Sequence, residues 1–93
     1  MTEEEILQKI ISVVSELYIN PYGERGEIKP ETCPPRDLIG FDSVNSFEAS
    51  LVLSEAIGIE LDAEFLVKKI RNKLPTIEIM ASQIYEMQEK SLE

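Results

Sequence analysis

The residue best placed to do chemistry in this chain is Ser43, within the run LIGFDSV from Leu38 to Val44. Asp42 precedes it, and Gly40 permits a tight turn just before a predicted helix. A helix N-terminus offers unsatisfied backbone N–H groups and the positive end of the helix dipole, which would stabilise a phosphate esterified to the Ser43 hydroxyl. These residue types therefore favour a site of covalent modification over a catalytic site.

Nothing in the sequence supplies a base or a metal cluster for catalysis. The chain has no histidine and a single cysteine, so neither Ser43 nor Cys33 has an imidazole partner, and no zinc cluster of the usual Cys/His type can form. The acidic pairs at predicted helix starts are typical caps. We therefore expect no catalytic residue, no metal site and no enzyme activity in this chain.

The composition narrows the class of partner. A chain of 93 residues predicts one domain, residues 1–93, and its net charge of -9 argues against binding to nucleic acid or an anionic membrane. Basic protein surfaces are the partners that such a charge favours. A lone cysteine, an acidic N-terminus and the lack of a long apolar run indicate a cytoplasmic protein that does not insert into a membrane.

The apolar spacing predicts an all-α fold. The capping-box pair Thr2 and Glu5 starts a helix over about residues 3–18, and residues 19–41 form a long first loop because prolines and glycines interrupt any periodicity. A second helix runs from Ser43 to the breaker Gly58, a short third helix spans about 62–70, and a last helix follows residues 75–76. The prediction is a small four-helix bundle with three main helices and a short third helix.

Four loop residues are expected to anchor the long loop to the core: Ile28, Leu38, Ile39 and Phe41. The inward positions expected in the second half of the chain are Leu66, Val67, Ile70, Leu74, Ile77, Met80, Ala81, Ile84 and Met87. Cys33, beside two prolines, is expected to be an exposed thiol without a role.

The second helix carries apolar residues on two faces. The broad stripe, expected to face the core, is Ala49, Val52, Leu53, Ala56 and Ile57. A narrower stripe on the other side, called the docking strip below, is Val44, Phe47 and Leu51, with Glu48 and Glu55 beside it. Either the bundle surrounds this helix, or the docking strip is exposed and binds a partner next to Ser43.

The chain resembles the acyl carrier protein family. The resemblance rests on Asp42-Ser43-Val44, which looks like the family's Asp-Ser-Leu motif, with Gly40 two residues before Asp42. It implies that Ser43 carries 4'-phosphopantetheine, and that Asp42 shapes the start of the helix and contacts the phosphopantetheinyl transferase or its metal. It further implies that Val44, Phe47, Glu48, Leu51 and Glu55 recognise partner enzymes, because both glutamates fall where the family has recognition acids.

The resemblance implies a carrier that holds an acyl group as a thioester for loading and transferring enzymes, and we expect this carrier to be a monomer. The pathway would be fatty acid or specialised polyketide or lipid biosynthesis, and an aminoacyl or peptidyl carrier is an alternative. Asn45 and a basic cluster after the third helix depart from the usual acidic pattern and favour a specialised member; the cluster is Lys68, Lys69, Arg71 and Lys73. This cluster either pairs with acids such as Asp62 and Glu64 or contacts an acidic partner or the cofactor phosphate. An unmodified interaction module with the carrier fold is the competing interpretation.

Overall fold

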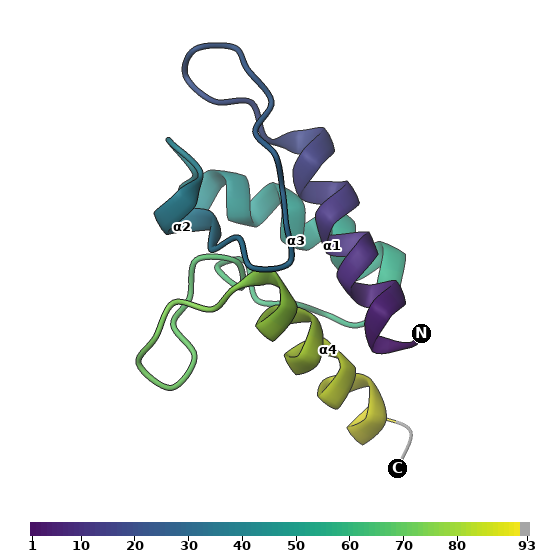
Figure 1. Ribbon diagram of the computed structural model, residues 1–93. Helices are drawn as coiled ribbons and strands as arrows, with labels where there is room; N and C mark the ends of the chain where they lie inside the picture. The colour runs from purple at the N-terminus through teal and green to yellow at the C-terminus, as the bar shows by residue number, and fades with distance from the viewer. Residues whose placement is uncertain (92–93) are drawn as a thin grey trace.

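The computed structural model describes residues 1–91 of the chain and is all-α (Figure 1). Three long helices carry the fold: α1 (Glu3–Leu17), α3 (Ser43–Ile57) and α4 (Ile77–Ser91). The remaining helix, α2 (Pro34–Asp37), is a single short turn between α1 and α3. The predicted small all-α bundle of three main helices and one short helix is therefore confirmed, although the short helix lies elsewhere in the chain.

Helix α1 begins at the predicted capping box. The Thr2 hydroxyl accepts from the Glu5 backbone N–H at 3.2 Å, and the Glu5 carboxylate accepts from the Thr2 N–H at 2.9 Å. Helix α1 packs against both α3 and α4. The amino group of Met1 donates to the Gln88 side chain at 3.0 Å, which places the start of α1 beside the far end of α4.

The core lies between the three long helices, as their burial shows. Helix α1 contributes Ile6, Ile10, Val13 and Val14, all buried. Of the inward positions predicted for the last helix, Ile77, Met80, Ala81 and Ile84 are buried and Met87 packs at the edge of the core. No helix within residues 1–91 is long and apolar enough to cross a membrane.

The long first loop serves as a cap for α4. The carbonyl oxygens of Thr32 and Pro30 accept from the backbone N–H groups of Ile77 and Glu78, at 2.9 Å in both cases. These donors belong to the first turn of α4, where no intrahelical acceptor exists. The loop therefore satisfies groups that would otherwise be unpaired.

The short helix α2 was not predicted, and it changes the position of Cys33. Pro34 and Pro35 begin α2, since proline is tolerated in the first turn of a helix. The Cys33 N–H donates to the Asp37 carboxylate at 2.8 Å, so the turn closes back over its own start. The prediction of an exposed Cys33 thiol is wrong, because this residue is fully buried.

Three of the four predicted loop anchors are confirmed. Leu38 and Phe41 are buried in the core and Ile28 packs against it. Ile39 is 58% exposed, so its prediction is wrong. The backbone of Ile39 is held instead of its side chain, because the buried Tyr18 hydroxyl donates to the Ile39 carbonyl oxygen at 2.7 Å.

The predicted third helix over 62–70 is wrong, because residues 63–67 form turns. The Ser46 hydroxyl on α3 donates to the Ala63 carbonyl at 2.9 Å and accepts from the Leu66 N–H at 3.1 Å. In a helix these two backbone groups would pair with residues four positions away, and the serine takes them instead. Leu66 is nonetheless buried as predicted, Val67 and Ile70 are half-buried, and Leu74 is exposed.

The buried face of α3 is narrower and more polar than predicted. Ala49 and Leu53 are buried and Ile57 is partly buried, whereas Val52 and Ala56 are exposed. Ser46 and Ser50 are also buried, and a prediction based only on the spacing of apolar residues does not include them. The Ser46 hydroxyl is paired with backbone groups, as described above, which allows it to lie in the interior.

Candidate functional site

Ser43 is the first residue of α3, and a reciprocal cap fixes its position. The Asp42 Oδ1 atom accepts from the backbone N–H groups of Val44 at 3.0 Å and Asn45 at 3.2 Å. The Asn45 side chain in turn accepts from the Asp42 N–H at 3.1 Å. Ser43 is exposed, and its hydroxyl has no hydrogen-bond partner within residues 1–91. The helix start therefore presents an unpaired hydroxyl to solvent on a backbone that these cap hydrogen bonds hold.

The cap alters what the helix start offers to a phosphate. The sequence suggested that first-turn N–H groups would be available to a phosphate on Ser43, but Asp42 already binds those of Val44 and Asn45. The Asp42 carboxylate also offsets the positive end of the α3 dipole. This arrangement holds the serine in place without enclosing a bound anion, so the hydroxyl is accessible to another protein.

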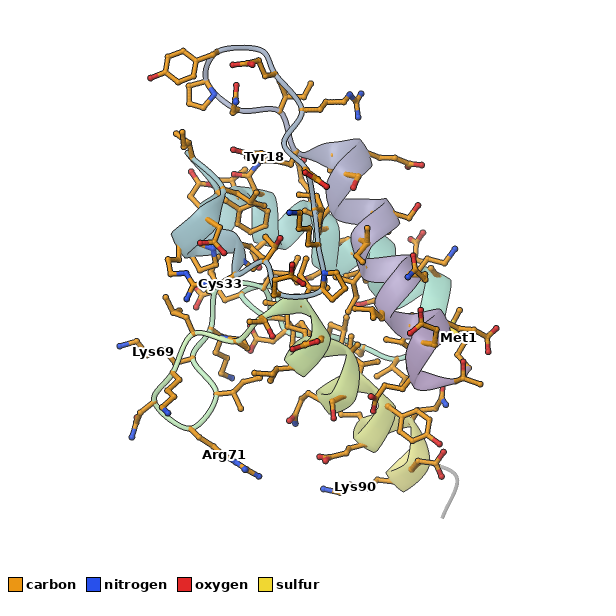
Figure 2. The ribbon with its side chains drawn as sticks, viewed as in Figure 1. Met1, Tyr18, Cys33, Lys69, Arg71 and Lys90 are labelled. Atoms are coloured by element: carbon orange, nitrogen blue, oxygen red, sulfur yellow. The ribbon has the colours of Figure 1, made fainter. Side chains whose placement is uncertain are left out.

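The segment that leads into α3 is held by a buried tyrosine. Tyr18, at the end of α1, donates to the Ile39 carbonyl and packs its ring against Phe41, with ring centroids 6.1 Å apart (Figure 2). Burial raises the pKa of the Tyr18 hydroxyl, which keeps it a donor. Gly40 has a φ of 79°, and a Cβ there would lie 3.3 Å from Pro21. The positive φ of this turn therefore favours glycine, and a side chain at this position would also crowd Pro21.

The docking strip is exposed along α3. Val44 is 63% exposed, Phe47 49% and Leu51 52%, so the bundle does not surround this helix. Glu48 and Glu55 are exposed beside them. An apolar strip with acidic neighbours is typical of a surface that binds a protein with apolar and basic groups.

A pocket of about 380 Å³ opens beside the docking strip. Phe47 and Leu51 line one side of it, and residues 60–63 line the other. Ser50 also lines it, and the Ser50 hydroxyl is buried without a hydrogen-bond partner among the described residues. Such a group is rare in folded proteins and lowers stability unless a ligand or water pairs with it.

Three serines one turn apart on α3 face the 59–66 segment, and sequence reasoning missed their role. Ser46 binds Ala63 and Leu66 as described above, and the Ser54 hydroxyl accepts from the Leu61 N–H at 3.0 Å. The signal available in the sequence was the spacing of Ser46, Ser50 and Ser54 at four-residue intervals. Asn45 was likewise available as the N3 residue of a capping box whose N-cap is Asp42.

The basic cluster is mostly unpaired. Lys68 lies 3.7 Å from Asp62, in an exposed ion pair. Glu64 forms no ion pair with the cluster among the described residues, so only the Asp62 part of the expected pairing is present.

No group of three or more His, Cys, Asp or Glu side chains that could hold a metal ion occurs within residues 1–91.

These features define a small, acidic, all-α protein that presents one serine hydroxyl at a helix start, next to an apolar docking strip. Over 64 residues, 69% of this chain, the sequence is 42% identical to a protein named acyl carrier protein from Prochlorococcus marinus (strain MIT 9515), and the match covers 75% of that protein. The chain belongs to the acyl carrier protein family. No family model matches the chain, and no solved structure matches it.

Proposed function

We propose that this protein carries an acyl group as a thioester on 4'-phosphopantetheine attached to Ser43. The observation that carries the proposal is the exposed, unpaired Ser43 hydroxyl held at the start of α3 by the cap of Asp42 and Asn45. The family supports this role, since the relative from Prochlorococcus marinus bears the name acyl carrier protein. The arm would supply the terminal thiol that forms the thioester.

Attachment requires little from the chain beyond the placement of Ser43. A separate phosphopantetheinyl transferase would join the Ser43 oxygen to the phosphorus of coenzyme A's pantetheine phosphate, with loss of the hydroxyl proton and of adenosine 3',5'-bisphosphate. Asp42 positions the serine through its Oδ1 atom. Its Oδ2 atom accepts no hydrogen bond from residues 1–91, so we assign it the contact with the transferase or its metal.

Recognition by partner enzymes is assigned to the docking strip and its acids. Val44, Phe47 and Leu51 would enter apolar pockets on loading and transferring enzymes, and Glu48 and Glu55 would face their basic surfaces. We propose that residues 1–93 act as one monomeric carrier domain in the cytoplasm, without catalytic residues and without nucleic acid as a partner. Fatty acid or specialised polyketide or lipid biosynthesis is the proposed setting.

The test is intact-protein mass spectrometry after incubation with coenzyme A, magnesium and a broad-specificity phosphopantetheinyl transferase. The wild type should gain the mass of one phosphopantetheine, and Ser43→Ala should gain none. Ser12→Ala is the matched control, because Ser12 is an exposed helical serine on α1, and it should be modified like the wild type. No gain in the wild type, repeated with the host's own transferases, would favour the unmodified interaction module.

A further inference from the structure

The turn over residues 70–73, which carries two of the four residues of the basic cluster, has an unusual backbone. Ile70 and Lys73 exchange two backbone hydrogen bonds, at 2.8 and 3.1 Å, which close a tight turn. The two central residues, Arg71 and Asn72, have φ values of 52° and 66°. Asparagine tolerates this left-handed conformation, but arginine lacks a local reason to adopt it. A strained, charged residue at the tip of an exposed turn is a feature that function can explain.

The cations on this turn, and Lys69 just before it, form no ion pair with the described residues. Lys69, Arg71 and Lys73 are exposed and form no ion pair within residues 1–91, whereas Lys68 pairs with Asp62. Figure 2 shows the Lys69 side chain projecting away from the helices. In a chain with nine basic and 18 acidic residues, three unpaired cations within five positions form a local positive patch. This patch is complementary to an acidic partner.

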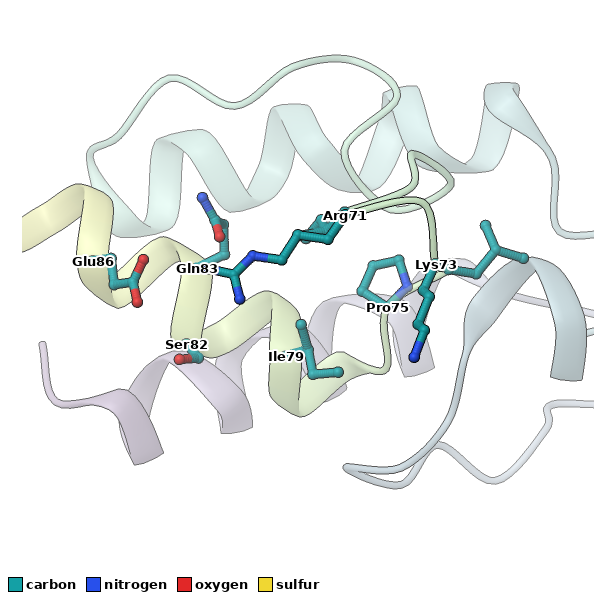
Figure 3. Close-up of a pocket in the computed structure, with 9 residues that line it drawn as sticks. Arg71, Lys73, Pro75, Ile79, Ser82, Gln83 and Glu86 are labelled. Atoms are coloured by element: carbon teal, nitrogen blue, oxygen red, sulfur yellow. The ribbon is translucent and has the colours of Figure 1, made fainter.

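A groove of about 550 Å³ lies between this turn and α4 (Figure 3). The Arg71 side chain extends over α4 toward Gln83, and Lys73 lies on the other side of Pro75 (Figure 3). Two exposed apolar side chains line the groove: Leu74 is 39% exposed and Ile79 48%. The groove therefore combines apolar surface with two cations, one from each side of the turn.

We propose that this groove binds an amphipathic, acidic peptide segment of a partner protein. The carboxylates of the segment would face Arg71 and Lys73, and its apolar side chains would cover Leu74 and Ile79. A small inorganic anion would leave the apolar surface exposed, and an uncharged peptide would leave both cations without partners. Glu86 lines the groove as well. Because it would repel carboxylates, the acidic part of the bound segment must lie away from Glu86, which sets the orientation of the segment in the groove.

This surface is separate from the one assigned to the carrier role. None of the residues that line the groove belongs to the docking strip or to the Ser43 cap. The two surfaces also differ in charge, since acids border the docking strip, whereas two cations and one acid, Glu86, border the groove. An acidic segment can therefore hold the protein at the groove while a basic enzyme binds near Ser43.

The experiment is a titration of ¹⁵N-labelled protein with a synthetic helical peptide that carries leucine on one face and glutamate on the other. A second peptide with glutamine in place of every glutamate is the control ligand. The glutamate peptide should shift the amide signals of residues 70–74 and of Ile79 and Gln83, and the glutamine peptide should bind more weakly. The protein is used as Ser43→Ala, so that the result does not depend on modification of the serine.

Three variants separate charge at the groove from charge in general. Arg71→Gly removes the cation but suits the left-handed backbone, and it should weaken binding about two- to fivefold without lowering the melting temperature. Lys73→Gln should weaken binding to a similar extent. Lys9→Gln removes a positive charge from α1, outside the groove, and should leave the affinity unchanged. Shifts that lie elsewhere, no binding, or an equal loss in Lys9→Gln would overturn the proposal.

Discussion

The cap at Asp42 allows a quantitative test of how Ser43 is positioned. In Asp42→Ala, two first-turn N–H groups lose their acceptor, because Oδ1 serves both Val44 and Asn45. Loss of an N-cap side chain costs about 0.5 to 2 kcal/mol. Since this carboxylate accepts from two donors in a reciprocal cap, we expect Asp42→Ala to lower the free energy of unfolding by about 1 to 2 kcal/mol. In a domain of this size, each kcal/mol lowers the melting temperature by roughly 4 to 8 °C.

The matched variant is Asp42→Asn. Asparagine is about as good an N-cap as aspartate, so this variant should lie within about 0.5 kcal/mol of the wild type. It keeps the acceptor and removes the charge, so the two variants separate capping from charge. If Oδ2 of Asp42 contacts the transferase or its metal as proposed, Asp42→Asn is also modified more slowly than the wild type at unchanged stability.

Urea unfolding followed by far-UV circular dichroism measures both variants in the same buffer. The expected order of stability is wild type close to Asp42→Asn, and Asp42→Ala clearly below both. An equal loss in the two variants would show that charge, and not hydrogen bonding to Val44 and Asn45, holds the helix start. A loss below about 0.3 kcal/mol in Asp42→Ala would refute the reasoning that the cap stabilises α3.

Three further predictions follow from single side chains. The Arg36 side chain, together with the Cys33 N–H, lowers the pKa of Asp37 from 3.8 to about 2. The ionised carboxylate therefore stabilises the fold above about pH 4, and this contribution is lost as the pH falls toward 2. The urea midpoint of Asp37→Asn should therefore fall less between about pH 5 and pH 2 than that of the wild type. Ser50→Ala removes a buried unpaired hydroxyl and should raise the free energy of unfolding by about 1 kcal/mol; a decrease would mean that this hydroxyl is paired in solution. The buried Cys33 thiol should react with a water-soluble disulfide reagent much more slowly in the native protein than in urea, and equal rates would contradict its burial.

The sequence was most informative where local signals and apolar spacing agree. Thr2 and Glu5 marked the start of α1, Gly58 marked the end of α3 with a φ of 83°, and the spacing of Ile77, Met80 and Ile84 gave the buried face of α4. Capping chemistry is local, and helical periodicity depends on one repeating angle. The exposure of the docking strip was one of two alternatives that the sequence left open, because a helix with apolar residues on two faces is either surrounded by the bundle or exposed on one face.

The errors arise where side chains from distant segments compete with local structure. The predicted third helix is absent because Ser46, 17 and 20 residues away in the sequence, binds the backbone of Ala63 and Leu66. The burial of Cys33 depends on the turn that Pro34 and Pro35 begin, although proline pairs usually indicate a loop. Pairings of this kind are set by tertiary contacts, and neither propensity nor periodicity reports them.

The central claim is that Ser43 is the attachment point of 4'-phosphopantetheine, and the most direct measurement is the mass of the protein purified from its native host. Fragmentation of the peptide that contains Ser43 should place the phosphopantetheine mass on that residue, and the mass of any thioester on the arm would identify the carried group. Protein purified from the host with Ser43 unmodified in every growth condition would contradict the carrier function.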